Sequence, residues 1–150
     1  MPFDPLTAPL AEFPPRGNCF DRTCITRTVL GHVTGRWGSL VVAALRLEAV
    51  LRFSELRARI DGISEKMLAQ TLRDLERDGL LLRTSRPVVP PHVEYRLTPL
   101  GAGVAAHVEA LLSWIETHVR DLAGAQRAHD ARSDTASARG ELRDGVRKSP

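Results

Sequence analysis

The chain has 150 residues, of which 43% are hydrophobic and 26% are charged, an ordinary globular composition with room for one domain and two tails. The formal net charge is +3, from 21 basic and 18 acidic residues, so the chain is mildly basic and suits a nucleic-acid partner. No apolar run approaches the roughly 20 residues of a membrane helix. The N-terminus also lacks a signal-peptide pattern, so we expect a cytoplasmic protein without membrane contact.

The first part of the chain is expected to be an arm followed by helices. Residues 1–18 are proline-rich, which predicts an extended N-terminal arm, and residues 19–124 are predicted to form one domain. Apolar side chains recur at helical spacing in three stretches, at about 22–33, 36–49 and 55–60. We expect Trp37 to lie on the buried stripe of the second helix and Ser54 to cap the third.

A fourth helix, from Ser64 to Asp78, has a start signal and a stop signal. The turn Asp61-Gly62 and the N-cap residue Ser64 precede it, and Gly79 follows where a left-handed residue is wanted. One face is apolar and comprises Met67, Leu68, Leu72 and Leu75. The opposite face is cationic and amide-bearing, with Lys66, Gln70, Arg73 and Arg77. This pattern fits a helix that enters the major groove of DNA, and it also fits an ordinary solvated surface helix.

After this helix the pattern changes to that of strands. Residues 80–85 and 92–97 are predicted to pair as a hairpin across a proline-rich tip, which is the position of a wing. Thr98-Pro99 begins a last helix that runs to about Leu122, with an apolar stripe roughly 35 Å long. A small domain does not cover such a stripe alone, so we expect a homodimer. Residues 125–150 show no periodicity and are expected to be a disordered C-terminal tail.

Five segments carry a resemblance to a known family. They are Gly35-Arg36-Trp37, Arg52 to Arg57, Gly62 to Leu68, Leu72 to Leu80 and Val89 to Gly101. In this order and spacing they resemble the HxlR-type family of winged helix-turn-helix transcriptional regulators, over about residues 24–118. The resemblance implies a mainly α fold with a small β-hairpin wing, dimerising through its first and last helices. Glu48-Ala49-Val50 departs from the family's Gly-Pro-type turn, so the second helix is expected to run longer.

The residue pattern and the resemblance together predict a sequence-specific DNA-binding transcriptional regulator, with repression favoured over activation. Its partner would be a double-stranded DNA operator, with the fourth helix in the major groove and the wing on flanking DNA. The side chains expected at base edges are Ser64, Lys66, Met67, Gln70 and Thr71. The side chains expected at the DNA backbone are Arg52, Arg57, Arg73, Arg77, Arg83 and Arg86. The side chains expected at the dimer interface are Ile25, Val29, Val108, Leu111, Trp114 and Ile115.

A thiol is the candidate for regulation. Cys24 is expected in the first turn of the first helix, where free N–H groups, the helix dipole and the nearby Arg22 and Arg27 lower a thiol pKa. The resemblance implies a cysteine at this position, through which several members sense oxidants or electrophiles. Cys19 is then a resolving partner, or a partner for Cys24 of the partner subunit. The alternative interpretation is that Cys24 is a small buried hydrophobe.

Other classes of function have less support in the sequence. The five histidines show no metal-ligand spacing, and no nucleophile–base pair, phosphate loop or cofactor motif is visible. We therefore expect no enzyme activity, metal or cofactor. Two rivals stay open, namely control by a small-molecule effector at the dimer interface, and a protein-interaction module that uses the same fold without DNA.

Overall fold

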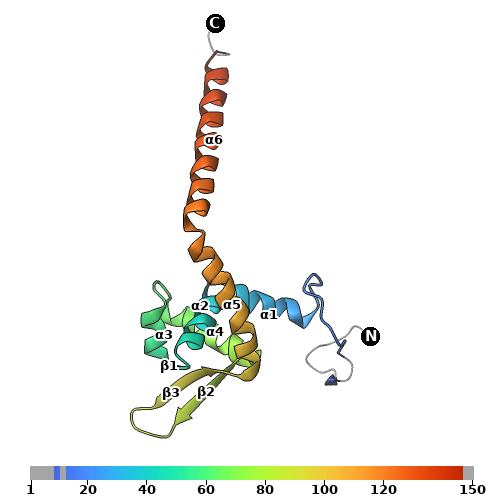
Figure 1. Ribbon diagram of the computed structural model, residues 1–150, viewed down its shortest axis with the longest axis vertical. Coiled ribbons are helices and arrows are strands. Elements are labelled where there is room, and N and C mark those ends of the chain that lie inside the picture. The colour runs from blue at the N-terminus through green and yellow to red at the C-terminus, as the bar shows by residue number, and fades with distance from the viewer. Residues whose placement is uncertain (1–8, 11–12, 147–150) are drawn as a thin grey trace. The chain divides into compact units, whose positions relative to one another are not determined.

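A computed structural model gives the structure of residues 9–10 and 13–146 (Figure 1). Along the chain the elements are α1 (Ile25–Thr34), α2 (Arg36–Leu47), β1 (Val50–Arg52), α3 (Phe53–Arg59), α4 (Glu65–Arg77), β2 (Leu81–Arg86), β3 (His92–Leu97), α5 (Pro99–Thr117) and α6 (Val119–Val146). The chain divides into two compact units, Met1–Glu109 and Ala110–Pro150. The ends of the predicted arm and tail, and residues 11–12 within the arm, lie outside the described residues.

The first unit contains a three-stranded antiparallel sheet in the order β1-β3-β2 (Figure 1). The segment expected only to be extended is its edge strand β1, which pairs with β3 so that Leu51 lies opposite Tyr95. Leu51, Leu81 and Tyr95 are buried on the same face of the sheet. The predicted hairpin of β2 and β3 is confirmed, and it forms the wing.

Helices pack against one face of this sheet and against one another. The largest fully buried side chains are Val41, Val42 and Leu45 from α2, Leu56 from α3, and Leu68 and Leu75 from α4. α1 contacts both α2 and α4. A Cβ atom at Gly38 would lie 1.8 Å from the carbonyl oxygen of His32, so the close crossing of α1 and α2 requires a glycine there.

The helix-turn-helix consists of α3, a turn and α4. Gly62 has a φ of 80°, which a glycine adopts without strain, and Ser64 then caps α4 by accepting a hydrogen bond from the backbone N–H of Met67 at 3.1 Å. Gly79 ends the helix with a φ of 75°. The predicted start and end of this helix are therefore confirmed.

Two helix starts differ from the prediction. α1 begins at Ile25 rather than near Arg22, because the Asp21 carboxylate accepts the N–H of Thr23 at 2.9 Å and holds a local turn before the helix. α3 begins at Phe53, so Ser54 is inside the helix and is not its cap. The cap is Arg52, whose N–H donates to the Glu55 carboxylate at 2.7 Å.

The expectation that α2 continues to Ala49 is wrong, because the helix ends at Leu47. Ala49 has a φ of 30°, an uncommon value for alanine, and it turns the chain so that Val50 enters β1. Glu48 pairs with Arg59 of α3 at 2.6 Å. The sheet pairing of β1 therefore decides where α2 stops, and local helix propensity does not.

The last helix starts as predicted and continues differently. The Thr98 hydroxyl accepts the N–H of Gly101 at 3.0 Å and donates to the carbonyl of Gly79 at 2.6 Å. The helix is interrupted at His118, and α6 then extends to Val146 where a disordered tail is expected. Residues 119–146 lack proline and are rich in alanine and arginine, which favours a helix without an apolar stripe. No helix within the described residues is long and apolar enough to cross a membrane.

Candidate nucleic-acid interface

The exposed face of α4 carries the basic and amide side chains that the sequence places there. Leu68, Leu72 and Leu75 are at most 2% exposed and attach the helix to the core. The exposed residues opposite them are Lys66, Gln70, Arg73 and Arg77. Met67 departs from the predicted apolar face, because it is 42% exposed and lies at the edge of the buried stripe. α4 therefore presents donors and one thioether to solvent.

The Gln70 amide is held at both ends by its neighbours. Its Nε2 donates to Asp74 Oδ1 at 2.9 Å, and its Oε1 accepts from Arg73 Nη2 at 3.1 Å. An amide nitrogen carries two hydrogens and an amide oxygen has two lone pairs. One donor and one acceptor of Gln70 thus stay available, in an orientation that the two neighbours fix. This is the pair of groups that a bidentate contact to adenine uses.

Two of the other predicted base-contact side chains, Ser64 and Thr71, make hydrogen bonds that hold the local structure. The Ser64 oxygen is the helix cap described above, and the Thr71 hydroxyl donates to the carbonyl of Met67 at 2.8 Å. Lys66 is exposed. On the α3 side of α4, Arg57 pairs with Glu65 at 2.6 Å, and both side chains are at least half exposed. Arg57 therefore lies beside the N-terminal turn of α4.

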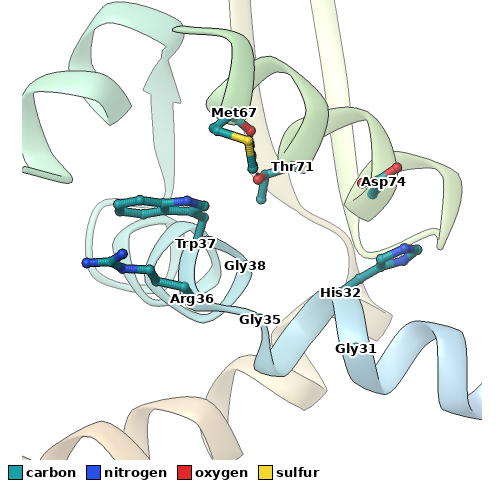
Figure 2. A pocket seen from close by; sticks show the side chains of 9 residues that line it. All are labelled: Gly31, His32, Gly35, Arg36, Trp37, Gly38, Met67, Thr71 and Asp74. Atoms are coloured by element: carbon teal, nitrogen blue, oxygen red, sulfur yellow. Dashed lines mark hydrogen bonds between the residues drawn. The ribbon is translucent and has the colours of Figure 1, made fainter. Parts of the chain in front are cut away.

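On the other side of α4, a cavity of about 220 Å³ separates the helix from the start of α2 and the end of α1 (Figure 2). Its walls are Gly31, His32, Gly35, Arg36, Trp37, Gly38, Met67, Thr71 and Asp74. The guanidinium of Arg36 lies 4.8 Å from the centre of the Trp37 ring, a cation–π distance. The sequence prediction omitted Arg36, although its position between Gly35 and Trp37 at a helix start was a signal.

A hydrogen bond joins the end of α1 to the end of α4. His32 Nδ1 and Asp78 Oδ2 are 2.7 Å apart, and the Asp78 side chain is only 9% exposed. A carboxylate at a helix C-terminus is opposed by the helix dipole, so this partner compensates an unfavourable position. Among the described residues, no group of three or more His, Cys, Asp or Glu side chains is arranged to hold a metal ion.

The wing carries two of the predicted backbone contacts. Arg83 and Arg86 are exposed, and their strand positions place them on opposite faces of the hairpin. Arg86 lies 4.0 Å from Glu94, which also bonds to His92 Nε2 at 2.6 Å. The His92 hydrogen bond is the main reason that the pKa of Glu94 lies below its usual range, and the charge of Arg86 adds to it. Arg52, in the edge strand, is exposed as well.

Cys24 occupies the N-cap position of α1 instead of its first turn. Its sulfur lies 3.0 Å from Thr26 Oγ1 and accepts the Asn18 N–H at 3.4 Å. These hydrogen bonds, with Thr26 first, hold the pKa of the Cys24 thiol below its usual value. The expected contribution of nearby arginines is not among the causes, and Arg27 instead donates to the Phe20 carbonyl at 3.1 Å.

The surroundings of Cys24 combine apolar and polar side chains and include part of the arm. A cavity of about 330 Å³ is lined by Phe13, Pro14, Gly17, Asp21, Thr23, Cys24, Ile25 and Thr26. Cys19 is exposed, Cys24 is half-buried, and both are free thiols. The alternative interpretation of Cys24 as a small buried hydrophobe fits only in part, because its side chain is half-buried.

The predicted dimer contacts divide into exposed and buried side chains. Ile25, Leu111, Trp114 and Ile115 are between 43% and 54% exposed, and Val29 is half-buried. Val108 is only 6% exposed because it packs inside its own protomer. Val108 is therefore a core residue, and its side chain leaves little area for a partner subunit.

Comparisons with known proteins agree with this geometry. Residues 32–122 match the family model described as HxlR-like helix-turn-helix. The chain is 57% identical over 106 residues to YtfH of Escherichia coli, an uncharacterized HTH-type transcriptional regulator, covering 71% of this chain and 83% of that protein.

Two solved structures resemble the fold. A putative transcriptional regulator, ytfH from Salmonella typhimurium, superposes with a TM-score of 0.70 and 55% identity over 75% of this chain and 98% of that one. The redox regulator HypR in its reduced form superposes with a TM-score of 0.59 and 31% identity over 65% of this chain and 95% of that one. The winged helix-turn-helix geometry and the family match together show that this chain is a member of the HxlR-like helix-turn-helix family, whose members are transcriptional regulators.

Proposed function

We propose that this regulator binds its operator as a homodimer, with α4 of each protomer in a major groove. The observation that carries the proposal is the exposed face of α4, where Gln70 is held by Arg73 and Asp74 with one donor and one acceptor free. Lys66 and Gln70 would read base edges, whereas Arg73 and Arg77 would contact the backbone.

The experiment that tests this function is selection of bound duplexes from random DNA, with and without a thiol oxidant. Recovery of one short motif, in two copies about one helical turn apart, supports sequence-specific binding by a dimer. A protein-interaction module without DNA binding would enrich no motif, and it would show no steep fall of DNA affinity with salt.

The homodimer is supported by apolar side chains that stay exposed in a single chain. Leu111, Trp114 and Ile115 follow one another on one side of α5 at helical spacing. A second copy of this chain would cover them, because a closed twofold interface pairs identical surfaces. Control by a small-molecule effector at that interface is the second candidate. The Trp114 ring is 54% exposed there and stacks on the His118 ring at 4.3 Å.

Replacing the wing arginine in Arg86→Ala is expected to lower the salt slope of DNA binding by roughly one unit. Arg86 is 65% exposed and would lose one phosphate contact, so operator and random duplex weaken alike. Affinities measured at several salt concentrations give the slope. Arg132→Ala, which removes an exposed arginine of α6, is the matched control. An unchanged slope for Arg86→Ala would remove the wing from the interface.

We further propose that Cys24 makes the regulator sensitive to oxidants or electrophiles. A lowered thiol pKa increases the thiolate fraction at neutral pH, and the thiolate is the reactive form. With diamide, two thiols lose two hydrogens to form a disulfide, and the diamide is reduced to the hydrazine. The second thiol is that of Cys19, either in the same subunit or in the partner subunit. HypR, a structural relative, is named a redox regulator.

The lowered pKa leads to a pH-dependence that can be measured. In a Cys19→Ser background, the rate of Cys24 alkylation is expected to rise with a midpoint below the free-thiol value of about 8.5. Thr26→Val removes the hydroxyl donor at 3.0 Å and should move the midpoint upward. A Cys24→Ser protein should keep its DNA binding under diamide. If it lost binding as the parent does, Cys24 would not be the sensor.

A further inference from the structure

We infer that Arg36, at the start of α2, is a phosphate contact on the flank of the recognition helix, beside the cavity of Figure 2. The inference rests on the proposed function, because it assumes that α4 enters a major groove. It adds a DNA-contacting element, α2, to the helix-turn-helix and the wing. The partner is the sugar-phosphate backbone of one strand bordering the groove.

The cavity borders α4 on the side away from α3. Met67 and Thr71 form its α4 wall, and both belong to the N-terminal half of the helix that is proposed to read bases. A helix about 10–12 Å wide fills a major groove about 12 Å wide, so a phosphate strand lies along each of its flanks. One flank of α4 faces α3 with Arg57, and the other faces the cavity with Arg36.

The Arg36 guanidinium is held by an aromatic ring and not by a carboxylate. It is exposed, and none of the ion pairs between described residues involves it, whereas Arg46, Arg57 and Arg59 each have a carboxylate partner. Its guanidinium instead lies 4.8 Å from the Trp37 ring centre. Stacking on an aromatic ring orients a guanidinium and leaves its N–H edges free for a phosphate.

The charged side chains Arg36 and Asp74 lie on opposite sides of the cavity. Figure 2 shows Arg36 and Trp37 on one side, and His32 and Asp74 on the other. The Asp74 carboxylate, which accepts from Gln70, would repel a phosphate on its own side. The backbone strand is therefore directed to the Arg36 side. This separation of charge favours a strand that passes along the cavity edge over an anion bound at its centre.

The test is the salt dependence of DNA affinity for the full chain and three variants. Arg36→Ala should lower the slope of log affinity against log salt by about 0.9. At 0.1 M salt this corresponds to about eightfold weaker binding, equally on operator and random duplex. Arg36→Lys keeps the charge, so its slope should equal that of the parent. Arg46→Ala, at the other end of α2 and paired with Glu109, is the matched control and should change neither. Circular dichroism confirms that each variant is folded.

The other outcomes separate this inference from the proposed function. A steep slope for the parent that Arg36→Ala leaves unchanged would overturn the phosphate contact and leave the proposed function intact. A loss confined to the operator would also overturn it, since Arg36 would then read a base. A parent protein without salt-dependent binding would overturn both. Suppose that a small anion bound in the cavity, and that Arg36→Ala abolished this binding but left DNA affinity unchanged. The cavity would then be assigned to an effector instead.

Discussion

Gln70→Ala is expected to weaken binding to the selected operator by about 1–3 kcal/mol, or roughly 5- to 150-fold, and to leave binding to random duplex nearly unchanged. The reason is that one amide donor and one amide acceptor are already oriented by Asp74 and Arg73, so little side-chain entropy is lost on contact with a base. Removal of the amide abolishes a contact that only the correct base pair offers. The measurement is a titration of both duplexes at one fixed salt concentration.

The matched control for this variant is Gln126→Ala, which removes an exposed glutamine from α6. It should bind both duplexes as the parent does. Equal losses on operator and random DNA for Gln70→Ala would show that Gln70 contacts the backbone, and the assignment of base reading to the N-terminal half of α4 would then be wrong.

Gly38→Ala is expected to lower the free energy of unfolding by about 1–3 kcal/mol, because the added methyl group meets the backbone carbonyl of His32. Backbone atoms cannot rotate away as a flexible side chain does, so α1 and α2 must separate. In an ordinary helix the same substitution stabilises by about 0.5–1 kcal/mol. The sign of the effect therefore distinguishes a close helix crossing from mere helix propensity.

A neighbouring glycine supplies the opposite expectation. A Cβ at Gly31 meets nothing within 4 Å, so Gly31→Ala should raise the free energy of unfolding by about 0.5–1 kcal/mol. Urea unfolding of both variants, with equal m values, measures the difference. If the two substitutions changed stability in the same direction, the crossing of α1 and α2 would differ from the one described.

The recognition helix was predictable from sequence because its signals are local. The Ser64 cap, the two positive-φ glycines around α4 and the spacing of its buried leucines all act within a few residues. Met67 is expected both on the apolar face and at base edges, and its 42% exposure fits the edge of the apolar stripe, where burial depends on what packs beside the helix. Met67 lines the cavity beside α4, and the periodicity of apolar residues does not predict a cavity.

Several of the remaining differences arise from contacts between distant parts of the chain. α2 ends early because β1 pairs with β3, more than 40 residues later in sequence. Val108 and Leu111 both belong to the apolar stripe of α5, three residues apart. Val108 is buried within its own protomer, whereas Leu111 is exposed. Arg36 reaches the flank of α4 because Gly38 allows α1 and α2 to approach closely. The end of α2 and the burial of Val108 depend on tertiary packing and have no local sequence signal.

Two side-chain hydrogen bonds at the C-terminal end of α4 restrict the movement of that end of the helix. His32 holds Asp78, and the Thr98 hydroxyl holds the carbonyl of Gly79, so α4 is fastened at its C-terminal end to the elements on either side. The 13 residues of α4 make it about 20 Å long. A tilt of about 5° around the fastened end would displace the Ser64 end by about 1.7 Å. We expect a small tilt of α4 about this end to displace mainly its N-terminal half, which is the part proposed to read bases.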